Sequence, residues 1–247
     1  MKQYHTQTQL GDVGRYVLMP GDPGRVPLIA ARLENAIHIA TNREYVTYTG
    51  WLEGEKVSVT STGIGCPSSA IAVEELYRSG ADTFIRVGTS GSLQPGTKSN
   101  DLAIVTGAIR HEGTSSHYMP IEFPAVCDLE IVQAMRSAVE RLGVRYQVGI
   151  SHSKDSFYGQ HEPERMGVAK DLLERWKAWE IGGALCSEME ASALFVIASM
   201  LRVRAGGVMM VHGKEPMPPL DILLETAVQA LRELIANDKA AGRAVTL

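Results

Sequence analysis

Residues 83–91, Thr83-Phe-Ile-Arg-Val-Gly-Thr-Ser-Gly91, join a short apolar run to a turn rich in glycine. Such a run, closed by a glycine turn, is typical of a strand buried inside a parallel sheet. Similar runs at Tyr16 to Met19, Leu102 to Thr106, Val148 to Ser151 and Ala205 to Val211 alternate with helical segments. We therefore expect an α/β fold in which ligands bind beyond the carboxyl ends of the strands.

The segments between these strands predict helices on both faces of a mostly parallel central sheet, part of which closes toward a barrel. The expected helices run from Asp22 and Pro23 to Leu33, from Ser68 or Ser69 to Leu76, from Asp128 to Leu142, from Glu188 to Leu201 and from Leu220 to Ala236. Tyr45 to Leu52 and Val57 to Thr62 predict a β-hairpin. Because no linker or repeat interrupts the pattern, we expect residues 1–247 to form a single domain.

The composition narrows the class of protein. The chain of 247 residues is 45% hydrophobic and 21% charged, which is typical of a globular protein, and its net charge of −4 argues against a broad basic face for nucleic acid. Cys66, Cys127 and Cys186 lack the paired spacing of zinc and redox sites, so we expect three reduced thiols. With no apolar stretch of membrane-spanning length and no signal-peptide pattern, we expect a cytoplasmic protein.

Several predicted strand ends combine glycine with arginine. Gly21 precedes Arg25, Arg43 precedes the hairpin, and Arg86 is followed by Thr89. Glycine lets backbone N–H groups approach an oxyanion, and arginine offers paired donors to phosphate. Arg86 lies inside an apolar strand, where a buried charge needs a partner; either a bound anion or an internal carboxylate would satisfy it.

Glu188-Met189-Glu190 opens an expected helix. Acidic residues in the first turn complement the helix dipole, which is one sufficient explanation for them. The alternative is that the carboxylates accept hydrogen bonds from sugar hydroxyls, with Met189 as an apolar floor.

The chain resembles the nucleoside phosphorylases of the trimeric and hexameric type, and most closely those acting on uridine. The segments that carry the resemblance are Gly21-Asp-Pro-Gly-Arg25, Asn42-Arg-Glu-Tyr45, Ser61-Thr-Gly-Ile-Gly-Cys-Pro-Ser68, Ala72-Val-Glu-Glu-Leu76, Ile85-Arg-Val-Gly-Thr-Ser-Gly91, Glu122-Phe-Pro-Ala-Val126, Asp155-Ser-Phe-Tyr158 and Glu188-Met-Glu190. The resemblance implies reversible phosphorolysis of a nucleoside to a free base and ribose 1-phosphate, by a pentosyltransferase with phosphate as co-substrate and no cofactor.

The resemblance also implies roles for individual residues. Phosphate would contact Gly21, Arg25, Arg86 and Thr89, with Arg43 reaching it from a neighbouring subunit. The implied ribose contacts are Thr89, Met189 and Glu190, with Glu188 close by and His5 across a dimer interface. Phe157 and Gln160 would face the base. Glu44, Ile64 and Ser68 match positions that hold a monovalent cation, K+, between subunits, and the expected assembly is a homo-hexamer built as a trimer of dimers.

Two loops depart from the family pattern. In Phe157-Tyr-Gly-Gln160-His-Glu162, one residue is missing before the glycine and Glu162 stands where the pyrimidine enzymes have arginine; Arg165 is a candidate substitute. The last-strand loop has His212 and no aspartate of the purine type. His212 could donate a proton to the base, or be a loop histidine without chemistry. We favour uridine, and a purine phosphorylase, a nucleoside hydrolase and a non-catalytic binding protein stay as alternatives.

Overall fold

The computed structural model describes residues 1–212 and 219–243. Its strands are β1 (Tyr16–Pro20), β2 (Glu34–Asn42), β3 (Tyr45–Leu52), β4 (Glu55–Thr60), β5 (Thr83–Ser92), β6 (Leu102–His111), β7 (Ala125–Val126), β8 (Tyr146–Lys154), β9 (Cys186–Glu188) and β10 (Arg204–His212). Its α-helices are α1 (Arg25–Ala30), α2 (Cys66–Arg78), α3 (Leu129–Leu142), α4 (Phe157–His161), α5 (Ala169–Ile181), α6 (Ala191–Leu201) and α7 (Asp221–Ala240).

All of these strands belong to one sheet. Strands β5, β10, β6, β8 and β9 pair in a closed ring, so this half of the sheet forms a small barrel, as predicted. Strands β1, β4, β3 and β2 extend the sheet from β5. Five of the ten pairings are parallel, so the sheet is mixed where we expected a mostly parallel one. The antiparallel pairings are those of β2 with β3, β3 with β4, β6 with β7, β6 with β10 and β5 with β9.

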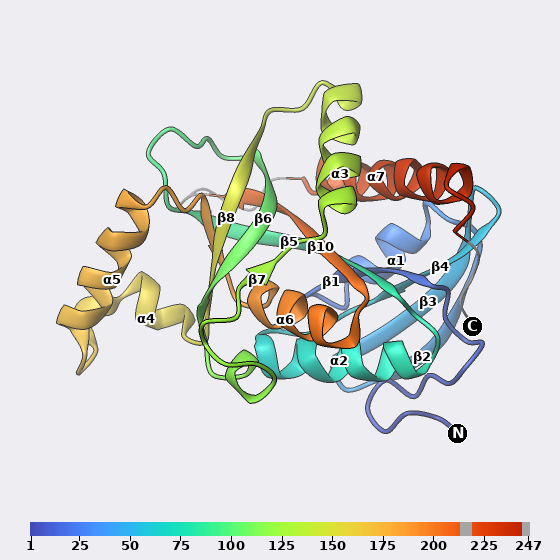
Figure 1. The fold of residues 1–247 in the computed structure, drawn as a ribbon, viewed down its shortest axis with the longest axis horizontal. Coiled ribbons are helices and arrows are strands. Elements are labelled where there is room, and N and C mark those ends of the chain that lie inside the picture. The colour runs from blue at the N-terminus through green and yellow to red at the C-terminus, as the bar shows by residue number, and fades with distance from the viewer. Residues whose placement is uncertain (213–218, 244–247) are drawn as a thin grey trace.

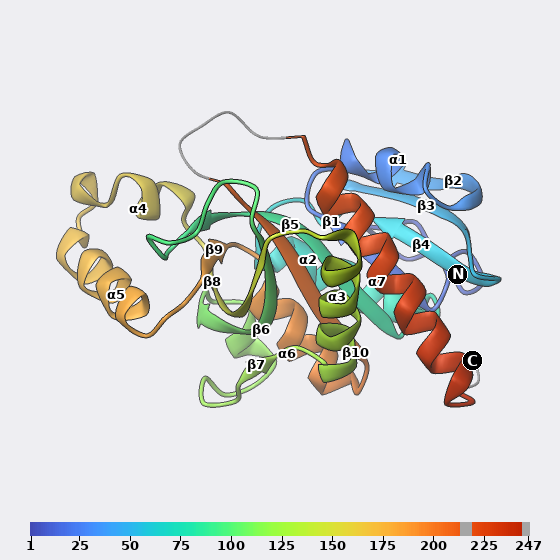
Figure 2. The ribbon, with the colours of Figure 1, turned by 90° about the horizontal axis from the view of Figure 1, so that it is seen from above.

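Helices cover both faces of the sheet, which confirms the expected α/β class. Helices α1, α3 and α7 lie on one face, and α2 and α6 lie on the other (Figure 1 and Figure 2). Each face has its own apolar core, and the two cores meet the sheet from opposite sides. The amphipathic helix α3 begins as predicted: the Asp128 carboxylate accepts from the backbone N–H groups of Glu130 and Ile131, and Gly143 ends it in the left-handed region.

Three expected helix starts are wrong. Helix α1 begins at Arg25, and the Asp22 carboxylate instead accepts from Gly24 N–H in the preceding turn, at 2.8 Å. Helix α2 begins at Cys66 after Gly65, with φ of 94°, so Ser68 and Ser69 lie within it and do not cap it. Glu188 belongs to β9, and α6 begins after Glu190. A glycine precedes the first residue of α1 and of α2, and at α6 the Glu188 carboxylate accepts from the N–H groups of Glu190 and Ala191.

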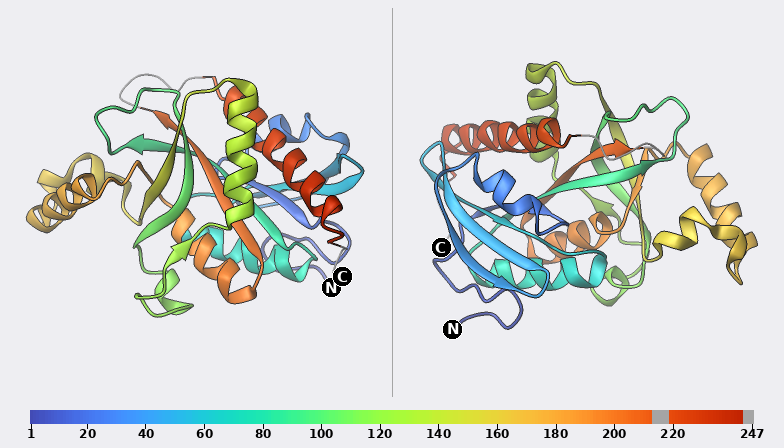
Figure 3. Two further views of the ribbon diagram at one scale, coloured as in Figure 1. Left: turned by 45° about the horizontal axis from the view of Figure 1, so that its top comes forward. Right: turned by 180° about the vertical axis from the view of Figure 1, so that it is seen from behind.

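Two elements have no clear signal in the sequence. Strand β2 has a single buried residue, Ala40, and therefore lacks the alternation that predicts a strand. Helix α5 has no buried residue, and with α4 it projects from the side of the barrel (Figure 3). The expected end of the first helix at Leu33 is also wrong, because the chain leaves Ala30 through tight turns into β2. None of the described helices has the length and apolar character needed to cross a bilayer.

Candidate active site

A cavity of about 1200 Å³ opens where four strands end. Gly21 follows β1, Thr89 lies near the end of β5, Lys154 ends β8 and His212 ends β10, and all four line the cavity. This is the arrangement expected for an α/β sheet, in which the strand ends collect ligand-binding loops. The described residues therefore bring the predicted loops after β1, β5, β8 and β10 to one site.

One end of the cavity is cationic. Arg25 and Arg86 both line it, and the Arg25 Nη2 donates to Thr89 Oγ1 at 3.4 Å. Gly21 packs closely here, because a Cβ on it would lie 3.2 Å from Arg86 Nη1 and 3.2 Å from Gly63 O, so a larger residue would displace one of these groups. Burial, and then the charge of Arg86, lower the pKa of Arg25. Two partly dehydrated guanidinium groups this close together would be stabilised by an anion between them.

Arg86 also has an internal partner. Its Nη2 donates to Glu190 Oε2, and both side chains are about 5% exposed. An internal carboxylate, Glu190, therefore neutralises part of the buried charge of Arg86, as one of the two explanations predicted. Its Nε, however, is buried without a hydrogen-bond partner among the described residues. Since a buried guanidinium N–H without a partner is costly, this atom is open to an acceptor brought by a ligand.

Glu190 is held in place by backbone donors. Its Oε1 accepts from Gly65 N–H at 2.8 Å, and its Oε2 accepts from Met189 N–H at 3.2 Å. Met189 is half-buried and lines the same cavity. The Arg86–Glu190 pair therefore lies between the cationic end of the cavity and the Met189 wall.

Glu188 has a structural task. Its Oε2 accepts from the N–H groups of Glu190 at 2.7 Å and Ala191 at 2.8 Å, which satisfies the first turn of α6. Its Oε1 accepts from Ser151 and Ser153 hydroxyls. Burial raises the pKa of Glu188, and the charge of Glu190 raises it further. The helix-end explanation thus applies to Glu188, which also lines the cavity, while Glu190 pairs there with Arg86.

The other end of the cavity is lined by Phe157, Gln160 and His161 from α4, by Ser187 from β9 and by Trp176 from α5. Phe157 is 51% exposed, and Gln160 is half-buried. The Gln160 Oε1 accepts from Ser187 Oγ at 2.7 Å. Uncharged polar groups and aromatic rings at this end suit a flat heterocyclic ligand.

Glu162 and Arg165 lie away from the cavity. The Arg165 Nε is 2.5 Å from Glu162 Oε2, and its guanidinium lies over the Tyr158 ring at 5.5 Å. Neither residue lines the cavity. Arg165 therefore does not reach the cavity in this structure, and its role as a substitute for the missing family arginine stays a prediction.

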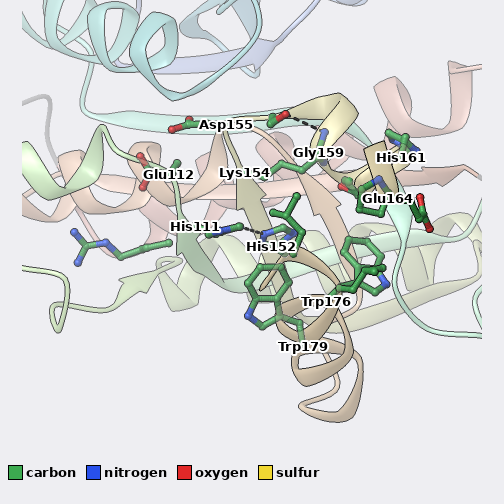
Figure 4. A pocket seen from close by; sticks show the side chains of 16 residues that line it. His111, Glu112, His152, Lys154, Asp155, Gly159, His161, Glu164, Trp176 and Trp179 are labelled. Carbon is green, nitrogen blue, oxygen red and sulfur yellow. Dashed lines mark hydrogen bonds between the residues drawn. The ribbon is translucent and has the colours of Figure 1, made fainter. Parts of the chain in front are cut away.

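Figure 4 shows the residues that line a second cavity, of about 630 Å³. The two cavities share Lys154, Gln160, His161 and Trp176. His111, His152 and Trp179 also line the second cavity. The His152 ring stacks on both His111 and Trp179, and the ring centroids of His152 and Trp179 are 4.0 Å apart. Burial lowers the pKa of His152 to about 3, so this imidazole is neutral near physiological pH.

His212 ends β10 opposite Gly91 of β5 and lines the large cavity. Its Nδ1 is buried without a hydrogen-bond partner among residues 1–212 and 219–243. The loop that follows, where the sequence lacks the purine-type aspartate, begins at residue 213 and lies outside the described residues.

Residues 15–238 match the profile of the Phosphorylase superfamily. The chain belongs to this superfamily. It is 46% identical to the uridine phosphorylase of Treponema pallidum, over 96% of this chain and 95% of that protein. It is 45% identical to the uridine phosphorylase of Thermococcus kodakarensis over 98% and 91%, and 39% identical to the guanosine phosphorylase of Halorubrum lacusprofundi over 86% and 83%. The resemblance inferred from the sequence is confirmed.

Some residues to which the phosphorylase resemblance assigns roles lie outside the cavity of this chain. The His5 Nδ1 contacts Glu75 Oε1 at 2.8 Å, which ties the N-terminal segment to α2. Arg43 is exposed in the turn between β2 and β3, with φ of 53°. Neither lines the cavity within one subunit. Their predicted roles require a neighbouring subunit and stay predictions.

The residues predicted to hold K+ are partly brought together. Ser68 Oγ donates to Glu44 Oε1 at 2.7 Å, and this bond is the main cause of the lowered pKa of Glu44. Ile64 is 79% exposed and lines the cavity with Glu44, whereas Ser68 does not. A carboxylate and a hydroxyl are oxygen ligands of a suitable kind, so the cation site stays a prediction.

The sequence analysis missed Lys154, Ser187 and Trp176. Lys154 directly precedes the Asp155-Ser-Phe-Tyr158 segment, at a strand end that the topology singles out, so its position was a usable signal. Ser187 lies next to the Glu188-Met189-Glu190 segment and carries no signal of its own. Trp176 belongs to α5, a helix that the sequence analysis did not include.

Proposed function

We propose that this protein catalyses reversible phosphorolysis of a nucleoside, with uridine favoured, to a free base and ribose 1-phosphate. The observation that carries the proposal is a single cavity with two arginines at one end, Glu190 and Met189 along its wall, and Gln160 at the other end. The names of the relatives from Treponema pallidum and Thermococcus kodakarensis support uridine as the substrate.

In this proposal the bond from C1′ of the ribose to the base nitrogen breaks, and its electron pair leaves with the base. A phosphate oxygen forms the new bond to C1′. The transition state has positive charge on the sugar, which the phosphate anion and Glu190 stabilise. Arg25, Arg86 and Thr89 would hold the phosphate in position, and Gln160 would hold the departing base. The chemistry of these residues requires phosphate only as a co-substrate.

The orphan Arg86 Nε gives the phosphate a defined partner. Arg86 Nη2 already binds Glu190, so the same guanidinium can link the phosphate to the carboxylate on the ribose side. Such a shared arginine would couple the placement of the two substrates. Met189 supplies an apolar surface beside them, and His212 is a candidate donor to the base.

Phosphorolysis of a purine nucleoside is the second candidate. The guanosine phosphorylase of Halorubrum lacusprofundi is 39% identical to this chain, and a cavity of about 1200 Å³ is large enough for a purine nucleoside. In that case His212, with its unpaired Nδ1, would be the residue near the ring nitrogens to test first.

The proposal includes an assembly and a location. We infer a homo-hexamer built from dimers, in which Arg43 and His5 complete a neighbouring subunit's site and K+ lies near Glu44, Ile64 and Ser68. We further propose a cytoplasmic role in nucleoside salvage, with nucleoside and phosphate as partners and neither nucleic acid nor membrane. The three free cysteines suit a reducing compartment.

The test is base release from uridine, thymidine, inosine, guanosine and adenosine, each with and without phosphate. Phosphate-dependent release from uridine supports the proposal, and phosphate-dependent release from a purine nucleoside alone supports the second candidate. Release that ignores phosphate would identify a nucleoside hydrolase. No release from any nucleoside, with binding retained, would identify a binding protein.

The matched variants are Arg86→Ala and Arg136→Ala. Arg86 is buried in the cavity, while Arg136 is an exposed arginine of α3 paired with Glu140. A phosphorylase loses phosphate use in the first variant and keeps it in the second. A hydrolase would keep its activity toward water in a folded Arg86→Ala variant.

A further inference from the structure

Lys154 is a buried cation at the base end of the cavity. It ends β8, is 5% exposed and lines both cavities; Figure 4 shows it among the residues that line the smaller one. Its Nζ donates to Ser187 Oγ at 2.8 Å and approaches the Glu188 carbonyl oxygen at 3.5 Å. Burying an ammonium group is costly, so a lysine kept here without a direct carboxylate contact needs an explanation.

Ser187 connects this lysine to Gln160. An ammonium group can only donate, so the Ser187 oxygen accepts from Lys154 and its own proton is free for Gln160 Oε1, at 2.7 Å. The Ser187 oxygen accepts a second hydrogen bond, from His152 Nδ1 at 3.0 Å, when the neutral imidazole carries its proton on Nδ1. The His152 Nε2 then accepts from His111 Nδ1 at 3.1 Å.

These contacts run in one direction and end at the Gln160 amide. His111 donates to His152, His152 and Lys154 donate to Ser187, and Ser187 donates to the Gln160 carbonyl oxygen. The Gln160 amide nitrogen therefore points away from Ser187. Gln160 Nε2 lies 3.5 Å from the point that a Cβ on Gly91 would occupy, at the end of β5 in the cavity wall.

We propose that Lys154 is a positioning residue for base selection, which locks the Gln160 amide in one orientation through Ser187. This inference rests on the proposed function, because it names the class of base that the same site accepts. The locked amide accepts bases that present a ring N–H beside a carbonyl oxygen. It rejects bases that present an amino group beside an unprotonated ring nitrogen.

The two classes of base have opposite hydrogen-bonding polarity at the same positions. Uracil, thymine, hypoxanthine and guanine carry a carbonyl next to a ring N–H, whereas cytosine and adenine carry an amino group next to a bare nitrogen. A glutamine that is free to rotate by 180° exchanges its oxygen and nitrogen and can pair with either class. A glutamine whose oxygen is already bound to Ser187 pairs well with the first class only. Lys154 thus weakens the binding of bases of the second class, in addition to supporting the binding of the first class.

Lys154 lies among several groups that titrate. Those that face it or line the adjoining cavity are Cys186, Glu188, Glu190, His111, His152, His161, His212, Arg110, Glu112, Asp155 and Glu164. Burial lowers the pKa of Lys154 to about 8, and the carboxylates of Glu188 and Glu190 oppose that decrease. The lysine is charged below this pH and becomes neutral as the pH rises through it. A neutral amine can accept the Ser187 proton, which releases the Gln160 amide.

The experiment compares kcat/KM for uridine and cytidine at saturating phosphate in the wild type, Lys154→Met, Lys154→Arg and Ser187→Ala. Lys170→Met, which changes an exposed lysine of α5, is the matched control. We expect Lys154→Met and Ser187→Ala to reduce the uridine-to-cytidine ratio about tenfold or more. Without the ammonium group, the Ser187 proton can turn to His152 Nδ1 in its other tautomer, and without the serine the Gln160 oxygen loses its donor, so in both variants the amide can rotate. Lys154→Arg retains the ratio, and the KM for phosphate stays unchanged in all four variants.

The pH profile separates positioning from a general loss of structure. In the wild type the ratio decreases as the pH rises through about 8. In Lys154→Met it is low and independent of this ionisation, and in Lys154→Arg it stays high to a more alkaline pH. A Lys154→Met variant that keeps the wild-type ratio and its pH dependence would overturn the inference.

A binding measurement keeps this test separate from the proposed function. If the wild type releases no base from any nucleoside, the proposed function fails, and calorimetric titration with free uracil and cytosine then tests the lysine. A preference for uracil that disappears in Lys154→Met supports the inference, and an unchanged preference contradicts it. If inosine is the substrate instead, the same comparison uses inosine and adenosine.

Discussion

At the scale of single residues, the cavity contains two arginines in different electrostatic situations. Arg86 is paired with Glu190 in the interior, whereas the carboxylate contact of Arg25 is Asp22, at 4.0 Å. Burial and the charge of Arg86 both lower the pKa of Arg25. Arg86 therefore contributes to the folded structure itself, while Arg25 has only a distant carboxylate partner and a hydrogen bond to Thr89, which leaves its charge available to a ligand.

This difference predicts that substituting Arg25 changes phosphate binding without changing stability, whereas substituting Arg86 lowers the stability. We expect Arg25→Met to raise the KM for phosphate by roughly 10- to 100-fold, the loss of one or more charged hydrogen bonds, without lowering the melting temperature. Arg86→Met leaves Glu190 buried without its partner and should cost about 3–5 kcal/mol of stability. Steady-state kinetics and thermal melting of both variants check this, and a clear destabilisation by Arg25→Met would contradict it.

At the scale of elements, helix ends were predictable where a local side chain closes them. Helix α3 has both of its signals in the sequence: Asp128 accepts from Glu130 N–H at 3.0 Å, and Gly143 has φ of 65°. Helix α2 begins after Gly65 without a side-chain cap. At α6, Glu188 accepts from the N–H groups two and three residues later, as Asp128 does at α3, and the hydroxyls of Ser151 and Ser153 in β8 hold its other oxygen.

The Asp128 cap is testable by stability. We expect Asp128→Ala to reduce the free energy of unfolding by about 1 kcal/mol, because two N–H groups of the first turn lose their acceptor. Asp128→Asn should retain most of the stability, since asparagine is also a good capping residue. Urea unfolding of the three proteins measures both, and equal losses in the two variants would show that charge rather than capping is responsible.

At the scale of the whole molecule, the cavity of one subunit is lined by Arg25, Arg86, Glu190 and Gln160 but not by Arg43 or His5. Those two residues lie on the exposed hairpin turn and on the N-terminal segment bound to α2. If they serve a neighbouring subunit, the active unit is at least a dimer. Light scattering should then give an oligomer, and a monomer with full activity would contradict the proposal.

Mixed oligomers provide a sharper test of shared sites. Arg43→Ala and Arg25→Ala subunits should each be nearly inactive alone. In a mixed dimer, one of the two sites receives an intact Arg25 and an intact Arg43, so an equal mixture should recover about a quarter of the wild-type activity. Activity measured after co-expression of the two variants checks this. No recovery in confirmed mixed oligomers would show that Arg43 does not complete a neighbour's site.

Much of the fold was predictable because its signals are local. Buried strands such as Thr83–Ser92 are apolar runs closed by glycine, and α3 has a cap at each end. Strand β2 and helix α5 were missed because almost all of their side chains are partly or fully exposed, which removes the pattern of alternation. The balance of parallel and antiparallel pairs could not be predicted either, because short strands such as β7 and β9 exist only by pairing with distant partners.

The sequence by itself determined the α/β class, the superfamily and the strand ends that collect Gly21, Arg25, Arg86, Thr89 and Glu190, because these depend on short segments with their own chemistry. The tertiary structure alone decided which charges meet. It pairs Arg86 with Glu190 across 104 positions, leaves the Arg86 Nε open, removes Arg165 from the cavity, and connects Lys154 through Ser187 to Gln160. Hydrogen bonds act over about 3 Å, so contacts between residues far apart in the chain depend on the packing of the whole sheet.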